Sequence, residues 1–277
     1  EKPTISYTGN FNFNTPASVP QKVNVLQHIE MMGELYANDG ISNHFFTHLL
    51  PYVNTADIYS KNPEVVKGPF GDTPDLVLGW HDWWKEMYGT AFDHSHNLSI
   101  SGGSEKSNYY ASIGYLDQGS MFNYGEHNNK KYWGRFKYEY NLNKYIKLRS
   151  NVYVGRKKVT EPYDINQLAW LTYWTWNCQP TFNPQGQYYG SGGFGNPIAF
   201  AEHTGNRWKT YYSYYTQLGF DITPLKNLTI TGDMSLNYDI SDEKYYRKRH
   251  QTYHWDGSLN YDVIDYWYSG KTKTESL

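Results

Sequence analysis

Several long stretches of the chain alternate between apolar and polar residues at every second position. The clearest runs from Leu228 to Ile240, where the even positions are apolar, aromatic or Gly and the odd positions are Thr, Asp, Ser or Asn. This period predicts β-strands with one apolar and one polar face. The predicted strands lie within Ile5–Phe13, Asn108–Leu116, Tyr132–Tyr140, Tyr145–Arg156, Tyr211–Ile222 and Leu228–Ile240. Strands of about 9 to 11 residues are long enough to cross a bilayer when tilted.

The connections between these strands differ in length in a regular way. Gly102–Lys106, Leu142–Lys144 and Thr223–Lys226 are short turns, whereas 14–92 and 160–209 are long. Short turns at one rim and long loops at the other are typical of an outer-membrane β-barrel, with the long loops outside the cell. We therefore predict an all-β fold that is part of a large transmembrane antiparallel β-barrel, about seven strands of about 22. The apolar face of each strand would point to lipid and the polar face into the lumen.

A second interpretation of the alternation stays open at this point. A half-buried antiparallel sheet in a water-soluble protein has the same period, so the chain also fits a soluble β-sandwich that binds carbohydrate through exposed aromatic residues. The length of the strands and the tyrosines near their ends, such as Tyr109-Tyr110 and Tyr211-Tyr212, favour the barrel, because aromatic girdles lie at the headgroup level.

The long connections contain two stretches with helical spacing. Lys22–Asn38 has a stripe of Val25, Leu26, Ile29, Met32 and Tyr36, which predicts an amphipathic helix. Pro74–Tyr88 contains Trp80, Trp83 and Trp84 and predicts a second helix. A Trp-rich helix either contacts a membrane or partner surface or packs against its own loop, and the sequence favours packing.

The amino-acid composition limits the classes of function that the chain can have. The 277 residues include 29 Tyr and 10 Trp although the mean hydropathy is -0.78, so the chain is polar but rich in amphipathic rings. With 25 Lys and Arg against 27 Asp and Glu, the charge gives no sign of nucleic-acid binding. Cys178 is the single cysteine, which excludes an internal disulfide.

Aromatic residues gather in the long connection 160–209. The rings that we select as candidates for binding a substrate are Trp170, Trp174, Trp176, Tyr188 and Tyr189. Flat rings at the mouth of a barrel are suited to stacking on sugar faces or peptide side chains. The alternative, equally open here, is that these rings pack the loop shut. Gly192-Gly193-Phe194-Gly195 lacks the Lys and Ser/Thr of a phosphate-binding loop and reads as a flexible turn.

We expect no catalytic site, no metal site and no cofactor. His44 with His48 and His94 with His96 are close in sequence, but neither pair has the Glu of a His-Glu-x-x-His motif. No Ser/His/Asp spacing or pair of carboxylates indicates an enzyme. Acidic residues of the last clear strand are better explained as lumen and rim residues of a wet barrel: Asp233, Asp239, Asp242 and Glu243.

Several separated motifs resemble one family. HNLSISGGSEKSNYYASIGYLDQGS, residues 96–120, resembles the start of the barrel in SusC/RagA-type TonB-dependent transporters of the Bacteroidota, where a strand, a Gly-Gly-Ser turn and a strand ending in Tyr-Leu-Asp-Gln recur. KPTISYTGNFNFNTP, residues 2–16, is similar to the strand that follows their plug domain. PTFNPQGQYYGSGGFGNPIAF (180–200) and LGFDITPLKNLTITGDMSLNYD (218–239) resemble the next long loop and hairpin.

The resemblance implies that residues 1–277 are the N-terminal portion of such a barrel, with strand 1 at about 4–13, a long loop at 14–92 and further strands and loops at 93–277. The plug and the remaining barrel of the family are absent from the chain. The resemblance also implies SusCD-type, TonB-dependent import of a large nutrient, a glycan or an oligopeptide, across the outer membrane. TonB, through the missing segments, and a SusD-like surface lipoprotein are the implied partners, besides the cargo and outer-membrane lipid.

Overall fold

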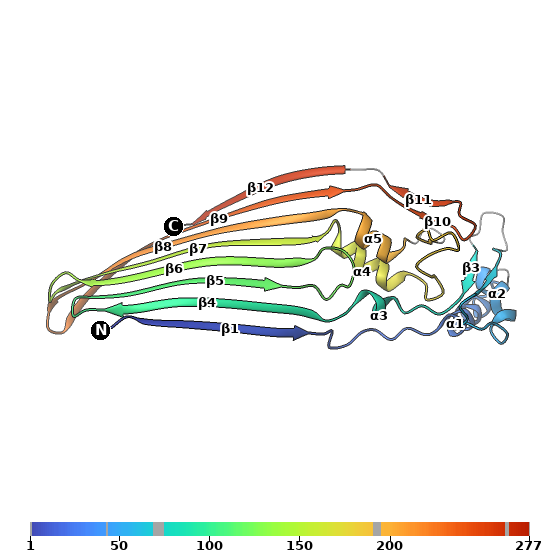
Figure 1. Ribbon diagram of the computed structural model, residues 1–277, viewed down its shortest axis with the longest axis horizontal. Helices are drawn as coiled ribbons and strands as arrows, with labels where there is room; N and C mark the ends of the chain where they lie inside the picture. Colours follow the sequence, from blue (N-terminus) through green and yellow to red (C-terminus); the bar gives the residue numbers. More distant parts are fainter. Residues whose placement is uncertain (1, 43, 69–74, 191–194, 264–265, 277) are drawn as a thin grey trace.

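The computed structural model describes residues 2–42, 44–68, 75–190, 195–263 and 266–276. Its main element is an antiparallel sheet of eight long strands in the order β1-β4-β5-β6-β7-β8-β9-β12 (Figure 1). The strands are β1 (Thr4–Asn14), β4 (Ala91–Gly103), β5 (Ser107–Gln118), β6 (Asn128–Asn141), β7 (Ile146–Pro162), β8 (Asn206–Leu225), β9 (Leu228–Arg247) and β12 (Tyr266–Ser276). The predicted all-β class is confirmed, and the arrangement is that of part of a β-barrel.

The sheet has one strand more than the sequence predicted. The additional strand, β12, pairs with β9 from Tyr266↔Arg247 to Ser276↔Asn237. Its sequence YWYSGKTKTES has no clean alternation of apolar and polar residues, so the period gave no signal for it.

Short turns and long loops lie at opposite ends of the sheet, as predicted. Side chains within the short turns stabilise the turn conformation. Ser104 Oγ accepts hydrogen bonds from the backbone N–H groups of Lys106 and Ser107. Asn143 Oδ1 likewise accepts from the N–H groups of Tyr145 and Ile146, at 2.8 and 3.0 Å. The connections at the other end span 15–90, 119–127, 163–205 and 248–265.

The register brings the apolar positions of the strands to one face, which we call the apolar face. Residues that are directly paired across strands point to the same side of a sheet. One such row consists of Tyr7, Leu98, Ile113, Gly134, Val154, Tyr214 and Tyr238. The parallel row two residues nearer the turns consists of Ile5, Ile100, Ala111, Phe136, Val152, Thr216 and Leu236.

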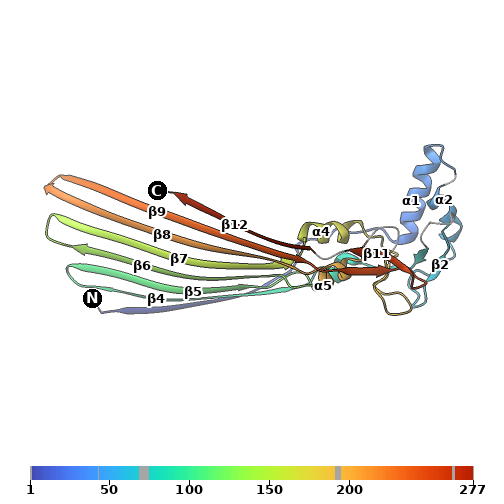
Figure 2. The ribbon, with the colours of Figure 1, turned by 90° about the horizontal axis from the view of Figure 1, so that it is seen from above.

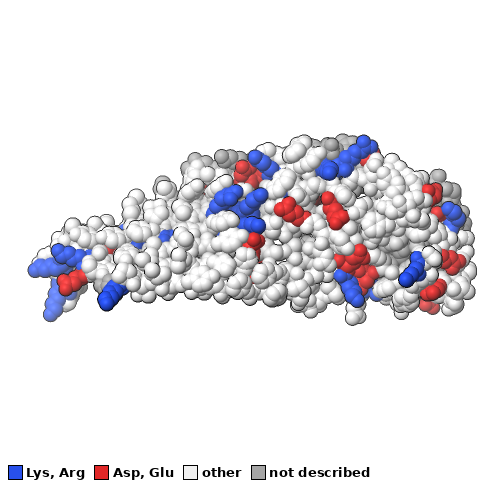
Figure 3. Space-filling model, viewed as in Figure 1, with Lys and Arg blue, Asp and Glu red and all other residues white. Residues whose placement is uncertain are grey.

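Large side chains of the apolar face are exposed. Ile5 is 69% exposed, and Ile113 and Met234 are each 65% exposed, so the described elements do not cover this face. Figure 3 shows a broad stretch of the molecule without charged side chains, bounded by charged residues at the short turns and by a group of basic side chains towards the loop end.

The opposite face of the sheet is polar and contains ion pairs between strands. Arg149 on β7 binds Asp221 on β8 at 3.1 Å and Asp233 on β9 at 3.2 Å. Arg207 binds Glu243 at 3.1 Å. Of the acidic residues that we assigned to lumen or rim, Asp242 lies on the other side, in register with Thr210 near the loop end.

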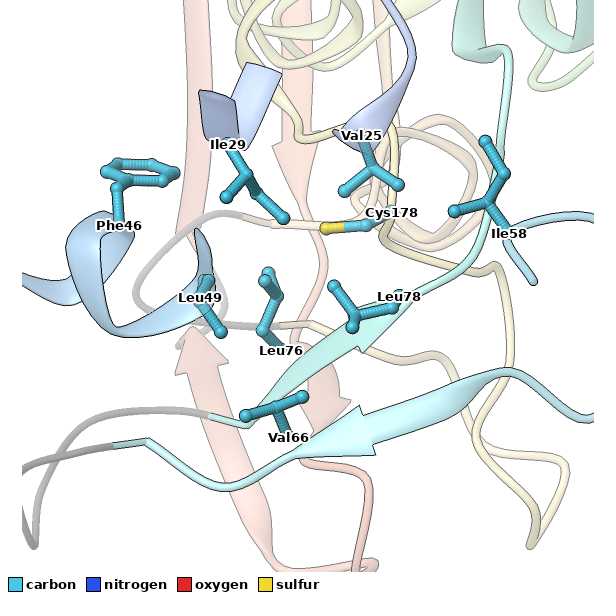
Figure 4. Packing of buried hydrophobic residues seen from close by; sticks show 9 residues of the cluster. All are labelled: Val25, Ile29, Phe46, Leu49, Ile58, Val66, Leu76, Leu78 and Cys178. Atoms are coloured by element: carbon cyan, nitrogen blue, oxygen red, sulfur yellow. The ribbon is translucent and has the colours of Figure 1, made fainter. Parts of the chain in front are cut away.

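The long loops fold into two small clusters at one end of the sheet. The first contains α1 (Val25–Asn38), α2 (Phe45–Leu49), the one-turn helix η1 (Leu50–Tyr52), β2 (Glu64–Val66) and β3 (Leu76–Leu78). Figure 4 shows how side chains from these elements point into one core with Cys178, which comes from the distant connection between β7 and β8. The core residues are Val25, Ile29, Phe46, Leu49, Ile58, Val66, Leu76, Leu78 and Cys178.

Of the two predicted helices, the first is confirmed as α1, and the second prediction was wrong in its first half. Leu76, Val77 and Leu78 are buried and form β3, which pairs with β2. A run of three buried residues fits a fully buried strand as well as a helix, and pairing with β2 decides the outcome. The helix α3 begins only at Trp83, after Asp82 caps it by accepting from Lys85 N–H, and it ends at Met87.

The second cluster joins α3 to the connection between β7 and β8. It contains α4 (Ile165–Trp174) and α5 (Pro197–His203), and the pair β10 (His250–Tyr253) and β11 (Leu259–Val263) lies beside α5. Trp83 is fully buried here and donates from Nε1 to the Trp176 carbonyl at 3.1 Å. The Trp-rich segment therefore packs against its own loops, as the sequence favoured.

Asn196 links the parts of this loop and is 1% exposed. Its Oδ1 caps α5 by accepting from the N–H groups of Ile198 and Ala199. Its Nδ2 donates to the carbonyls of Thr181 at 2.9 Å and Tyr189 at 3.1 Å. One buried amide thus satisfies four backbone groups of an otherwise irregular segment.

We expect Asn196→Ala to loosen this loop while leaving the sheet intact. Loss of a helix cap and of two donors to buried carbonyls costs about 2 to 4 kcal/mol. Limited proteolysis of the protein should then cut residues 175–205 faster than in the wild type. Asn166→Ala, an exposed residue of α4, is the control. Equal cleavage of the two variants would contradict this role of Asn196.

Candidate functional site

Helix α4 displays aromatic rings on its solvent side. Asp164 starts the helix by accepting from the N–H groups of Asn166 and Gln167, and Leu168 and Leu171 bury the opposite side in the second cluster. Trp170, Tyr173 and Trp174 are 49%, 55% and 53% exposed. Their spacing of three and four residues places them on one side of a helix. We call these three residues the α4 aromatic face.

The rings of this face are in contact with one another. The ring centres of Trp170 and Trp174 are 6.0 Å apart, and those of Tyr173 and Trp174 are 5.7 Å apart at nearly a right angle. Tyr173 was missing from our sequence candidates. Its place three residues after Trp170 would have identified it, had the segment been predicted as a helix.

A cavity of about 590 Å³ lies beside the α4 aromatic face, between α4 and α1. We call it the α1–α4 cavity, and Figure 2 shows the two helices on the same side of the loop end. Apolar and aromatic side chains form most of its wall. Lys22 and His28 are the basic side chains in this wall. Residues that line it include Lys22, Val25, His28, Met32, Phe46, Trp174, Trp176 and Cys178.

Lys22 brings a positive charge to this cavity. Its Nζ donates to the carbonyls of Thr172 at 3.2 Å and Thr175 at 3.1 Å, at the C-terminal end of α4. Burial lowers the pKa of Lys22 to about 8, against the opposing effect of Asp82. The ammonium group is therefore mostly charged at pH 7, and its third N–H can bind an anionic group.

Trp176 lies between the cavity and the first core. Its ring centre is 5.6 Å from that of Phe46 and 5.9 Å from that of Phe45. It is half-buried, in contrast to Trp174, so Trp176 both packs the core and forms part of the cavity wall.

The structure places Tyr188 and Tyr189 in the packing of the loop rather than on the α4 aromatic face. Tyr188 donates to Glu202 Oε2 at 2.6 Å, and burial and this carboxylate raise its pKa to about 12. Tyr189 is 2% exposed and donates from its hydroxyl to the Asp75 carbonyl at 3.1 Å. Of the two open interpretations of the loop rings, packing thus fits Tyr188 and Tyr189, and exposure leaves stacking to Trp170 and Trp174.

The histidine pairs have structural contacts. His44 caps α2 by accepting from Phe46 N–H and stacks on Tyr36. His94 and His96 lie on β4, with His94 Nδ1 and His96 Nε2 3.1 Å apart. Among the described residues no group of three or more His, Cys, Asp or Glu side chains is arranged to hold a metal ion. Ser191 to Phe194, part of the Gly-rich turn, lie outside the described residues.

Cys178 is inaccessible although it lies in a long loop. It is 4% exposed, and burial raises the pKa of its thiol to about 12. We expect a membrane-impermeant maleimide to label Cys178 only after denaturation, because the thiolate is the reactive form. Gln167→Cys in a Cys178→Ser background, exposed on α4, is the matched control and should react in the native protein. Rapid native labelling of Cys178 would contradict the packing of the first core.

Solved structures of one transporter share this fold. A chain of the RagAB peptide importer in its closed-closed state aligns with a TM-score of 0.62 and 20% identity, over 89% of this chain and 29% of that chain. A chain of the RagAB peptide transporter aligns with a TM-score of 0.62 and 18% identity, over 99% of this chain and 32% of that chain. For the open-open state the TM-score is 0.56 and the identity 18%, with the same coverage.

Comparison by sequence adds nothing to this result, since no family model and no curated protein matches the chain. No helix of the described residues is long and apolar enough to cross a membrane. The chain spans 29% to 32% of the length of the transporter chains that it matches. The protein therefore has the fold of one part of a RagAB-type transporter chain.

Proposed function

We propose that this chain forms part of an outer-membrane β-barrel that imports a large nutrient, an oligopeptide or a glycan. The exposed apolar face carries this proposal. In a soluble β-sandwich such a face packs against a second sheet, whereas here Ile5, Ile113 and Met234 remain about two-thirds exposed (69%, 65% and 65%). A broad band of aliphatic and aromatic side chains on one side of β1 and β4 to β9 is stable in contact with lipid.

The height of the apolar face fits a bilayer. On β7 it begins at Ile146, next to a short turn, and its first charged residue is Arg156, in register with Tyr132 and Tyr212. These ten residues extend over about 33 Å at about 3.3 Å each. A strand tilted by about 40 to 45° thus spans about 25 Å, the height of the apolar band of outer-membrane barrels.

The loop end supplies the surface for cargo. In this orientation the α4 aromatic face and the α1–α4 cavity lie outside the cell, where cargo arrives. Rings of this kind stack on sugars and on peptide side chains. The ammonium group of Lys22 in the cavity favours cargo with a carboxylate, such as a peptide C-terminus or an acidic side chain.

We infer the energy source and the partner from the likeness of this chain to other transporters. The similarity to RagAB chains and the sequence motifs shared with SusC/RagA-type proteins support TonB-dependent import together with a SusD-like surface lipoprotein. TonB would act through segments that this chain does not contain.

The orientation of the apolar face is tested with arginine substitutions at adjacent positions. Leu236 lies on the apolar face, near the middle of the segment from Ile230 to Ile240, and Ile240 is in the same row as Arg156. Its neighbour Ser235 lies on the polar face. In the complete barrel, Leu236→Arg should lower the free energy of unfolding by about 2 to 4 kcal/mol, because the charge enters hydrocarbon. Ser235→Arg is the control and should have a much smaller effect. A urea titration in lipid that finds the two equally tolerated would overturn the assignment.

The role of the α4 aromatic face is tested by removing its two indoles. We expect Trp170→Ala with Trp174→Ala to weaken cargo binding or uptake about tenfold or more, since two stacking rings contribute about 1 to 3 kcal/mol. Tyr59→Ala, a ring that is 74% exposed elsewhere in the loops, is the control. Unchanged uptake at normal surface abundance of the double variant would remove this face as the cargo site.

A further inference from the structure

On strands β1 and β4 to β9, charged residues appear on the apolar face only near the loop end. Beyond the apolar rows comes a row of Tyr115, Tyr132, Arg156 and Tyr212. The next row contains Asp117, Lys130, Lys158 and Thr210. Three cations from two adjacent strands, β6 and β7, thus lie at the loop end of this face: Arg156 within the row of tyrosines, and Lys130 and Lys158 in the row beyond it. We call Lys130, Arg156 and Lys158 the basic cluster.

Two acidic residues lie in the row of Lys130 and Lys158: Asp242 is two strands away from Lys158, and Asp117 is directly next to Lys130. Asp117 binds Lys130 at 3.4 Å and also accepts from the Tyr115 hydroxyl at 2.8 Å. Arg156 lies over the ring of Tyr212 with its guanidinium carbon 6.0 Å from the ring centre, and both Arg156 and Lys158 are exposed. The basic cluster with Asp117 therefore has a net charge of about +2, which favours an anion.

An apolar groove of about 560 Å³ adjoins the basic cluster. It exists because Gly134 has no side chain, while its register partners Ile113 and Val154 form the sides. A Cβ atom at Gly134 would be in ordinary van der Waals contact with Val154 Cγ2 at 3.5 Å, so a side chain at this position would occupy the groove without a clash at its Cβ. The groove is lined by Leu98, Ile113, Val154, Tyr214 and, at the loop end, by Tyr115, Tyr132, Arg156 and Tyr212.

We propose that this groove and the basic cluster bind one phosphate-bearing lipid of the outer leaflet. An acyl chain lies along Gly134 between Ile113 and Val154, and the lipid phosphate contacts Arg156 and Lys158. A guanidinium fork matches the geometry of phosphate oxygens, and an ammonium adds a second charge. The inference rests on the proposed function, because only a barrel in the outer membrane presents this face to lipid.

The positive charge of the basic cluster indicates which kind of molecule occupies the groove. A purely apolar protein segment would fill the groove but leave the basic cluster without a partner, and free phosphate would leave the groove empty. A lipid with an anionic headgroup satisfies both at the spacing that a bilayer imposes, with hydrocarbon below the tyrosines and charge above them.

The test uses the complete transporter, purified from outer membranes, delipidated in detergent and titrated with dipalmitoyl phosphatidic acid under native mass spectrometry. Arg156→Gln with Lys158→Gln should weaken binding about 30-fold, at about fivefold for each cation. Lys131→Gln with Lys157→Gln is the matched control: these residues pair with each other on the same two strands but lie on the polar face. The control should bind the lipid as the wild type does.

Two further measurements distinguish binding of the lipid headgroup from binding of the acyl chain. Gly134→Val fills the groove and should weaken binding of phosphatidic acid at least tenfold. Dipalmitoyl glycerol lacks the phosphate and inorganic phosphate lacks the acyl chains, so each should bind far more weakly than phosphatidic acid to the wild type. Equal losses in both charge variants, tight binding of inorganic phosphate alone, or no effect of Gly134→Val would each overturn the inference.

The two proposals can fail separately. Normal abundance in the outer membrane without specific binding of phosphatidic acid overturns the lipid site and leaves the transporter function in place. Recovery of the complete protein from the soluble fraction without detergent overturns the proposed function and, with it, the lipid site.

Discussion

The structure depends on one constraint: a large sheet presents a face that is mostly apolar and that the described elements do not cover. Hydrogen bonds between neighbouring strands satisfy the peptide groups inside the sheet, and β1 and β12 are its two edges. The apolar face must then be covered by something other than water, and the described helices and short strands all lie at the loop end instead. Lipid is the covering that fits both the height and the uniformity of this face.

The loop end follows a different principle. It has two small cores, and residues distant in sequence meet in them, as Cys178 does with Val25 and Leu78. Buried polar side chains, above all Asn196, take the place of regular secondary structure there by pairing backbone groups of irregular segments. This packing orients α4 so that one side is buried and the other displays the exposed rings of Trp170, Tyr173 and Trp174.

The basic cluster and the α4 aromatic face illustrate how a single β–α connection divides its chemistry. On β7, Arg156 and Lys158 point away from the polar face. A few residues later Glu161 lies within 3.2 Å of Lys209, and α4 follows at Ile165. The alternation within β7 and the start of α4 thus separate the basic cluster, which we propose for lipid, from the α4 aromatic face, which we propose for cargo.

The sequence by itself determined most of the long strands, their two faces and the ends at which short and long connections lie, because the alternation of side chains and the chemistry of Ser104 and Asn143 are local. It also identified α1 and selected Trp170 and Trp174 among five candidate rings, and the structure showed that these two are exposed. It gave no signal for β12. Only the tertiary structure decided that Leu76–Leu78 is a strand, that Tyr189 and Cys178 are buried, and that Arg156 meets Lys130 and Lys158 beside the groove at Gly134. The physical reason is that burial in the loops and neighbours across strands arise from contacts between segments far apart in the chain, which period and composition do not encode.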